Sequence, residues 1–370
     1  MAYKKIRSLT STGDKNFIEL LQHSFWAIVI LGLTTGLQFL FDFVLARKYE
    51  AHGTGVFYLC FTVLMTLALF GRLGLDQAVV RFIPPLLDKD PEKAAGVNSS
   101  SIKLSLYMTI PLAVLLFVLS PLLAEDLFHS PELTTYLRIF SLALPALSLN
   151  YVVAGVLRAL KRSKESLVIA RMSMYGLGIV GIFTLGTVYG LKGVVIGFAI
   201  SIYISTLLGF YFVRKHLTGH THVVPFSKKQ LLIISGPLLF VIFATQMSGQ
   251  ASVLLLGVFS TNADVGIFNI ALKISMLMNL ILAAINVFAA TKISELYFSK
   301  QKEELNIFIG KISALGTLLG LPLFIIISLF STFWLGLFGH TFEAGSSALI
   351  ILAAGQLVNV SVGSTSYILA

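Results

Sequence analysis

Three ionisable side chains, Asp42, Arg72 and Lys273, fall inside long apolar stretches of the sequence, and a fourth, Asp76, lies directly after one. A charged side chain at the centre of a membrane-spanning helix costs roughly 2.5–3.5 kcal/mol. Membrane proteins keep such groups where they face the interior of a helix bundle or line a path for an ion or a polar substrate. These four residues are therefore the first candidates for a transport pathway.

Arg72 and Asp76 are four residues apart, a spacing that places both side chains on one face of a helix. One interpretation is a local ion pair. The other is an entrance for an anionic headgroup, to which the nearby Arg81 and a second basic residue, Lys292, contribute further positive charge.

Two pairs of side-chain amides also recur at helical spacing inside apolar stretches. Gln246 and Gln250 form one pair, and Asn279 and Asn286 form the other. Each pair shares one helix face, which suits either hydrogen bonds between helices or the lining of a cavity that holds a sugar. The sequence leaves both alternatives open.

No arrangement typical of an enzyme is present, so we expect no catalytic residue and no cofactor. The sequence has no phosphate-binding loop, no paired-carboxylate motif placed suitably for catalysis and no nucleophile elbow. His216, His220 and His222 are the one cluster that resembles a metal site, but we expect no Cys, Asp or Glu nearby to complete it. A solvated loop without a metal is the better interpretation. The single cysteine, Cys60, excludes a disulfide framework.

The composition predicts an all-α polytopic membrane protein. Hydrophobic residues make up 56% of the chain and charged residues 12%, against about 25% charged in an ordinary soluble protein. Roughly 20 apolar residues in a helix span the hydrocarbon core of a bilayer. We expect ten such helices, at about residues 25–45, 54–75, 102–123, 135–157, 167–189, 192–213, 231–259, 265–290, 311–334 and 346–369.

The net charge of +10 is explained by topology and does not require a nucleic-acid partner. Most Lys and Arg residues lie in the N-terminal tail and in every second loop, while the intervening loops hold few. Cytoplasmic loops of membrane proteins carry this excess of basic residues. We therefore expect a multi-pass protein of a bacterial or archaeal inner or plasma membrane, with its N-terminus in the cytoplasm.

This orientation places Asp42 and Lys273 in the outer half of the membrane. Our hypothesis is that the two side chains meet, or line one polar cavity, near an outer gate. The alternatives are that Asp42 reaches the membrane surface beside Arg47 and that Lys273 extends outward to the headgroups.

An internal repeat at an offset of 211 residues runs without gaps from the first helix through the loop after the third. Less common residues match at this offset, as in Gly55 with Gly266, Arg81 with Lys292 and Pro111 with Pro322. A shift of six helices preserves orientation, so the two halves should be parallel repeats about an axis along the membrane normal. We expect an N-terminal lobe at 1–222 and a C-terminal lobe at 223–370. A complete second half projects to roughly residue 424, so we expect this chain to be truncated.

Three segments carry a resemblance to a known family. They are GRLGLDQAVVRFIP at 71–84, AGVLRALKR at 154–162 and ADVGIFNIALKI at 263–274. With the repeat, they resemble Wzx-type O-antigen and polysaccharide flippases of the multidrug/oligosaccharidyl-lipid/polysaccharide exporter superfamily. The resemblance implies two six-helix lobes around a cationic cavity that opens alternately to each side. It also implies an undecaprenyl-diphosphate-linked oligosaccharide as the substrate, with Arg72, Arg81, Lys273 and Lys292 as candidates to compensate the diphosphate.

Other functions remain open from the sequence. A cation-coupled multidrug exporter of the same superfamily would use Asp42 as its coupling site. A lipid II flippase is another alternative. Members of the superfamily that resemble lipid II flippases usually have more helices than the repeat predicts for this chain. A non-transporting partner of a glycan polymerase or ligase would not depend on charges inside the bundle. The resemblance itself implies lipopolysaccharide or O-antigen assembly, with those polymerase and ligase proteins as possible partners.

Overall fold

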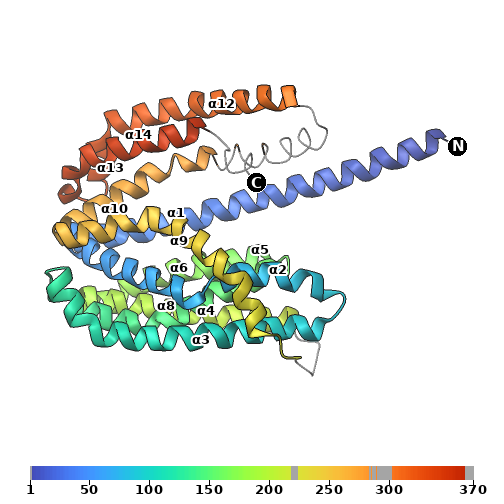
Figure 1. Cartoon of the computed structure of the whole chain (residues 1–370). Helices are drawn as coiled ribbons and strands as arrows, with labels where there is room; N and C mark the ends of the chain where they lie inside the picture. The colour runs from blue at the N-terminus through green and yellow to red at the C-terminus, as the bar shows by residue number, and fades with distance from the viewer. Residues whose placement is uncertain (1, 218–223, 283–284, 286–288, 290–301, 363–370) are drawn as a thin grey trace. The chain divides into compact units, whose positions relative to one another are not determined.

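The computed structural model describes residues 2–217, 224–282, 285, 289 and 302–362 (Figure 1). Every regular element in these ranges is a helix, which confirms the all-α prediction. Nine of the described helices are long and apolar enough to cross a membrane. Each of the ten predicted blocks overlaps one of these helices, and the first two blocks share the single stretch Gly32–Arg72.

The long helix α1 (Ala2–Arg72) is broken at Glu50, whose backbone has φ 54° and ψ −168°. This break separates the first two predicted spans and falls between them, as the charged and polar residues 47–52 indicate. The remaining helices of the N-terminal half are α2 (Leu75–Leu87), α3 (Pro91–Leu122), η1 (Leu123–Leu127), α4 (Leu133–Ala159), α5 (Ser163–Leu167), η2 (Val168–Met172), α6 (Ser173–Phe183), α7 (Leu185–Val188) and α8 (Gly190–Leu217).

The C-terminal part of the chain continues with helices of the same kind. The described elements are α9 (Lys228–Phe259), α10 (Asn262–Met276), α12 (Lys302–Leu329), α13 (Ser331–Gly336), η3 (His340–Gly345) and α14 (Ser346–Val362).

The chain divides into two compact units. The larger unit comprises Gly36–Ala271 and Thr332–Ser346, and the smaller unit comprises Met1–Thr35, Leu272–Ser331 and Ser347–Ala370. The lobe boundary that we expect near residue 222 stays a prediction. In the smaller unit, α12 and α14 pack closely, since a Cβ atom at Gly316 would lie 2.5 Å from the carbonyl oxygen of Val360.

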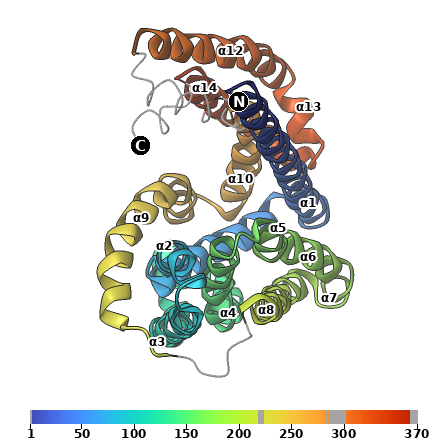
Figure 2. The same ribbon diagram turned by 90° about the vertical axis from the view of Figure 1, so that its right-hand side faces the viewer.

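An aromatic cluster forms the core of the larger unit. Phe57 from α1 packs against Phe198 of α8 and Phe140 of α4, with ring centroids 5.2 Å and 5.8 Å apart. Phe41 lies 5.2 Å from Phe198 in the same cluster. All four rings are fully buried. In Figure 2, α4 lies between α2, α3 and α8, and the contacts of these helices agree. Within the larger unit, the cluster therefore packs the part of α1 that follows Gly36 against α4 and α8.

Helix α10 meets the second half of α1 at two glycines that the sequence repeat pairs with each other. A Cβ atom at Gly55 would lie 1.6 Å from the carbonyl oxygen of Asn262, and one at Gly266 would lie 2.1 Å from that of Ala51. Asn262 is itself 211 residues after Ala51, as Gly266 is after Gly55. The contact is thus reciprocal, as are the contacts between two copies related by a two-fold axis. The contact agrees with the sequence repeat at these two positions, and the parallel arrangement of two complete lobes stays a prediction.

Candidate functional site

The site is built around a sharp turn between α1 and α2. Arg72 is the last residue of α1, and the next two residues, Leu73 and Gly74, have φ values of 51° and 70°. A Cβ atom at Gly74 would lie 2.6 Å from the carbonyl oxygen of Ser235 and 2.8 Å from the backbone nitrogen of Leu239. Glycine is therefore required here for its left-handed backbone and for the close approach of α9.

This turn corrects one prediction. Arg72 and Asp76 do not share a face of one continuous helix, because the left-handed residues between them end α1 and start α2. The pair forms nonetheless, with Arg72 Nη1 3.6 Å from Asp76 Oδ2. Both side chains are buried.

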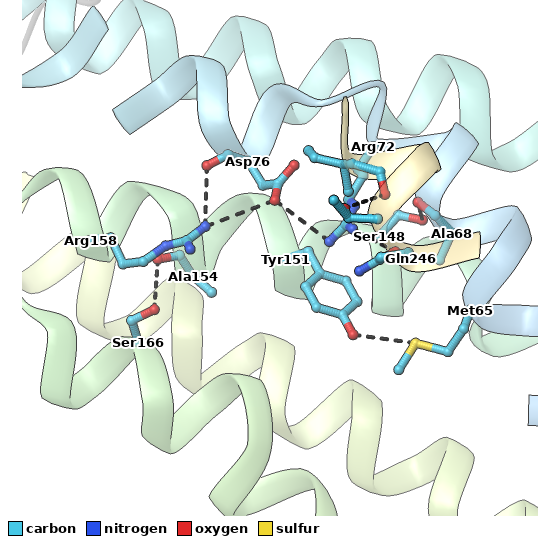
Figure 3. Close-up of polar contacts among 12 residues, drawn as sticks. Met65, Ala68, Arg72, Asp76, Ser148, Tyr151, Ala154, Arg158, Ser166 and Gln246 are labelled. Atoms are coloured by element: carbon cyan, nitrogen blue, oxygen red, sulfur yellow. Dashed lines mark hydrogen bonds and ion pairs between the residues drawn. The ribbon is translucent and has the colours of Figure 1, made fainter. Parts of the chain in front are cut away.

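Besides Asp76, the Arg72 guanidinium contacts two side chains from other helices (Figure 3). Its Cζ atom lies 4.3 Å from the centroid of the Tyr151 ring, on α4. Its Nη2 donates a hydrogen bond of 3.2 Å to Gln246 Oε1, on α9. Tyr151 in turn donates to Met65 Sδ at 3.3 Å. A guanidinium plane stacks on an aromatic ring in a way that a lysine ammonium cannot match.

Asp76 also interacts with a second arginine. Arg158 of α4 places Nη2 3.9 Å from Asp76 Oδ2, and the same nitrogen donates to the backbone oxygen of Asp76 at 3.4 Å. One carboxylate thus lies between two guanidinium groups, and the cluster carries a net charge of +1. We call Arg72, Asp76 and Arg158 the arginine–aspartate cluster.

Two buried polar atoms of this cluster have no hydrogen-bond partner among the described residues. They are Arg72 Nε and Asp76 Oδ1. Charge-assisted N–H···O contacts in proteins are about 2.7–2.9 Å long, so the 3.6 Å and 3.9 Å separations are loose. The cluster therefore has unused capacity both to donate and to accept hydrogen bonds.

The two glutamines of α9 do share one face, and that face is turned to α1. Gln246 binds Arg72, and Gln250 Oε1 accepts a hydrogen bond of 3.1 Å from Thr66 Oγ1. Of the two alternatives for this pair, the described contacts are hydrogen bonds between helices. We call the contact between the second half of α1 and α9 the α1–α9 seam. Phe70 and Phe243 also meet in the seam, with ring centroids 5.6 Å apart.

Asp42 lies deep in the larger unit, with an exposed fraction of 1%. Tyr58 donates a hydrogen bond to Asp42 Oδ1. The alternative in which Asp42 reaches the membrane surface beside Arg47 is therefore wrong. Arg47 instead donates from Nε to the carbonyl oxygen of Leu337 at 2.6 Å. Lys273 lies in α10, half-buried, in the smaller unit. Its pairing with Asp42 stays a prediction.

The other predicted residues are dispersed. Arg81 lies on α2 with an exposed side chain. Asn279 Oδ1 accepts a hydrogen bond of 3.2 Å from Asn359 of α14, within the smaller unit. Lys292 and Asn286 lie outside the described residues. The headgroup entrance built from Arg81 and Lys292 therefore stays a prediction.

The histidine cluster also needs a correction. Glu165 is remote from His216 in the sequence, yet the fold brings Glu165 Oε2 to 3.0 Å from His216 Nε2. The expectation that no acidic residue lies near the cluster is wrong for this histidine. His220 and His222 lie outside the described residues, and the part of the chain that the structure describes holds no group of residues suited to a metal ion.

A family model described as "Polysaccharide biosynthesis protein" matches residues 20–291, which is most of the chain. The chain belongs to this family. The match includes the arginine–aspartate cluster, the α1–α9 seam and the reciprocal glycines, and it confirms the family resemblance of the three quoted segments.

The fold of the chain is similar to that of solved transporter structures. An inward-facing multidrug resistance MATE family transporter of the MOP superfamily is 19% identical, with a TM-score of 0.71 over 93% of this chain and 86% of its own. A MOP superfamily transporter from Pyrococcus furiosus, described as having a binding pocket of reverse polarity, is 17% identical, with a TM-score of 0.60 over 95% and 84% of the two chains. None of the curated proteins compared with the chain matches it.

Two residues of the site could not be identified from the sequence. Arg158 lies in the AGVLRALKR segment, and Tyr151 precedes it by two helical turns on α4. Neither is spaced from Arg72 in a way that a local pattern reveals, because the contacts join residues about eighty positions apart. The structure shows why Arg158 comes close to Asp76, since a Cβ atom at the neighbouring Gly155 would lie 2.3 Å from the carbonyl oxygen of Asp76.

We expect Gly155→Ala to destabilise the protein and to disturb the arginine–aspartate cluster. The added methyl group must push α2 away from α4, and overpacking of this kind costs about 1–3 kcal/mol. A lower midpoint of thermal unfolding of the purified protein in detergent checks this. Gly355→Ala is the matched control, because a Cβ atom at Gly355 meets nothing within 4 Å. Equal midpoints for the two variants would contradict the prediction.

Proposed function

We propose that the protein is a flippase that moves an undecaprenyl-diphosphate-linked oligosaccharide from the cytoplasmic to the outer leaflet of the membrane. The observation that carries the proposal is the match to a polysaccharide biosynthesis family over residues 20–291, in a chain with nine described helices long enough to span a bilayer. A membrane protein of a polysaccharide biosynthesis family whose sequence shows no enzymatic motif is best explained as a transporter of a lipid-linked intermediate.

Alternating access of the two repeats is the mechanism that a parallel repeat supports. Contacts between the repeats exist at two places in the larger unit. The glycines Gly55 and Gly266 meet at one place, and the α1–α9 seam holds Arg72 to Gln246 at the other. Rocking of one repeat against the other would open one set of contacts while the other stays closed. The positive-inside distribution of Lys and Arg supports the orientation in which the Arg72 end faces the cytoplasm.

A cation-coupled multidrug exporter is the second candidate. Two observations favour it: the fold shared with a multidrug resistance MATE family transporter, and the buried Asp42, whose carboxylate accepts a hydrogen bond from Tyr58. An acidic group held inside the bundle is the type of residue that binds a proton or cation. Asp42 is then the coupling site.

A deletion strain distinguishes the two candidate functions. In cells that lack the full-length gene, the flippase predicts that undecaprenyl-linked repeat units accumulate on the cytoplasmic leaflet while drug sensitivity is unchanged. The multidrug exporter predicts a normal pool and greater sensitivity to cationic drugs. Restoration of the pool by the reintroduced gene is the control in the first case. A normal pool contradicts the flippase.

We further expect outward movement of the substrate to depend on the membrane potential. A diphosphate carries negative charge, and an inside-negative potential favours its export by roughly 2.3 kcal/mol per charge per 100 mV. Collapse of the potential with valinomycin and potassium in inverted vesicles should therefore slow the translocation of a labelled lipid-linked oligosaccharide. An unchanged rate would show that charge movement does not drive export.

A further inference from the structure

The arginine–aspartate cluster is confined to the first repeat. At the offset of 211 residues, Arg72 and Asp76 match Ala283 and Val287, which are apolar. The charges are therefore not among the features that the two repeats share, although the glycines and prolines of the repeat are. Burial of an ion cluster is not a general source of stability, because well-packed apolar residues often serve equally well. The presence of the charges in one repeat alone therefore favours a role in ligand binding over a role in stability.

The geometry of the cluster is that of an anion site already filled by a side chain. Two guanidinium groups converge on the one oxygen Asp76 Oδ2, at 3.6 Å and 3.9 Å. Both distances exceed those of a direct charge-assisted hydrogen bond. One carboxylate oxygen is thus too small to satisfy both arginines, and Arg72 Nε has no partner among the described residues.

Based on the proposed function, we propose that Arg72 and Arg158 bind the diphosphate of the substrate, and that Asp76 is the resident anion that the diphosphate displaces. A diphosphate presents several oxygens over a greater span than a carboxylate and suits the forked donors of arginine. Access is from the side of Arg158, whose side chain is 41% exposed. Arg72 is held from behind by the ring of Tyr151.

Binding at this site also acts on the α1–α9 seam. The Arg72 nitrogen that donates to Gln246 Oε1 is one of the donors that a phosphate recruits. Recruitment of that donor removes one of the two side-chain hydrogen bonds described across the seam, and the Thr66–Gln250 bond remains. The site therefore couples arrival of the headgroup to loosening of the contact between the two repeats.

The test is equilibrium binding of two probes, undecaprenyl diphosphate and inorganic pyrophosphate, to the purified full chain in nanodiscs. Asp76→Asn keeps the shape of the side chain but removes the competing charge. We expect it to tighten binding by about tenfold or more, since close buried charge pairs are coupled by at least that factor. Arg72→Gln and Arg158→Gln should each weaken binding by about the same factor.

Two matched controls make the same changes in net charge elsewhere. Asp126→Asn removes an exposed carboxylate, and Lys103→Gln removes an exposed cation. Neither should alter binding. A preference for undecaprenyl diphosphate identifies a lipid headgroup as the ligand, and equal binding of pyrophosphate identifies a free phosphate compound.

Unchanged or weaker binding by a folded Asp76→Asn protein overturns the proposal. If that variant does not fold, Arg158→Gln decides, because its side chain is partly exposed; undiminished binding then overturns the proposal. The outcome is separate from that of the flippase. Accumulation of lipid-linked oligosaccharide in the deletion strain, together with insensitive binding, rejects this anion site alone. A normal pool together with the expected binding changes rejects the flippase and leaves the anion site standing.

Discussion

Addition of one methyl group at Gly55 or at Gly266 is expected to impair transport strongly. A Cβ atom at Gly55 would lie 1.6 Å from the carbonyl oxygen of Asn262, whereas carbon and oxygen atoms in close contact are about 3.3–3.6 Å apart. Helices α1 and α10 must therefore separate by about 2 Å in Gly55→Ala. The conformation in which α1 and α10 are in contact becomes less stable by about 1–3 kcal/mol. The equilibrium therefore shifts about 5- to 150-fold towards the conformation in which the two helices are apart.

The measurement is the ability of each variant to clear accumulated lipid-linked oligosaccharide from the deletion strain, at matched protein levels in the membrane. Gly36→Ala is the control, because a Cβ atom at Gly36 meets nothing within 4 Å. The two glycines act on one contact, so Gly55→Ala with Gly266→Ala should cost less than the sum of the single changes. Wild-type clearance by Gly55→Ala would mean that this contact does not close the transporter.

A covalent cross-link across the α1–α9 seam is expected to stop transport completely and reversibly. Phe70 and Phe243 face each other in the seam, with ring centroids 5.6 Å apart. Cysteines at these two positions, joined by a short reducible cross-linker, prevent separation of α1 from α9. Alternating access requires the contact between the repeats to open, so the cross-linked protein should be inactive in vesicles until a reductant is added.

The background for this experiment is favourable, because Cys60 is the single cysteine and is buried. Leu142→Cys with Tyr203→Cys is the matched control pair. Tyr203 of α8 donates to the carbonyl oxygen of Leu142 of α4, and both side chains are exposed within the first repeat. A cross-link there should be tolerated. Activity of the cross-linked seam would show that α1 and α9 move together.

The helices and the repeat could be predicted from the sequence because lipid imposes a simple rule. Every span must satisfy its own backbone and offer about 20 apolar residues. Helix α2 does not follow this rule. It has 13 residues and contains Pro84 and Pro85, and it packs against α3 and α4 without spanning the membrane. Hydropathy alone therefore merges it into the loop after the second predicted helix.

The site was only partly predictable, because its chemistry depends on contacts between distant residues. The spacing of Arg72 and Asp76 indicated their ion pair, although a turn and not a continuous helix brings them together. Arg158 joins Asp76 from 82 positions away, and Gln246 joins Arg72 from 174 positions away. No local pattern encodes such distances, and the close approach of α2 to Gly155 that positions Arg158 is visible only in the folded chain.

The reciprocal glycine contact has a consequence for the origin of this architecture. Because Gly55 meets the segment that begins at Asn262 as Gly266 meets the segment that includes Ala51, a half-length ancestor could form the same interface with a second copy of itself. In that homodimer a single codon would specify both sides of the contact, and any side chain larger than hydrogen would strike its own copy. Gene duplication and fusion would release the two positions to vary separately. Retention of glycine at both positions then reflects the backbone spacing of the pair.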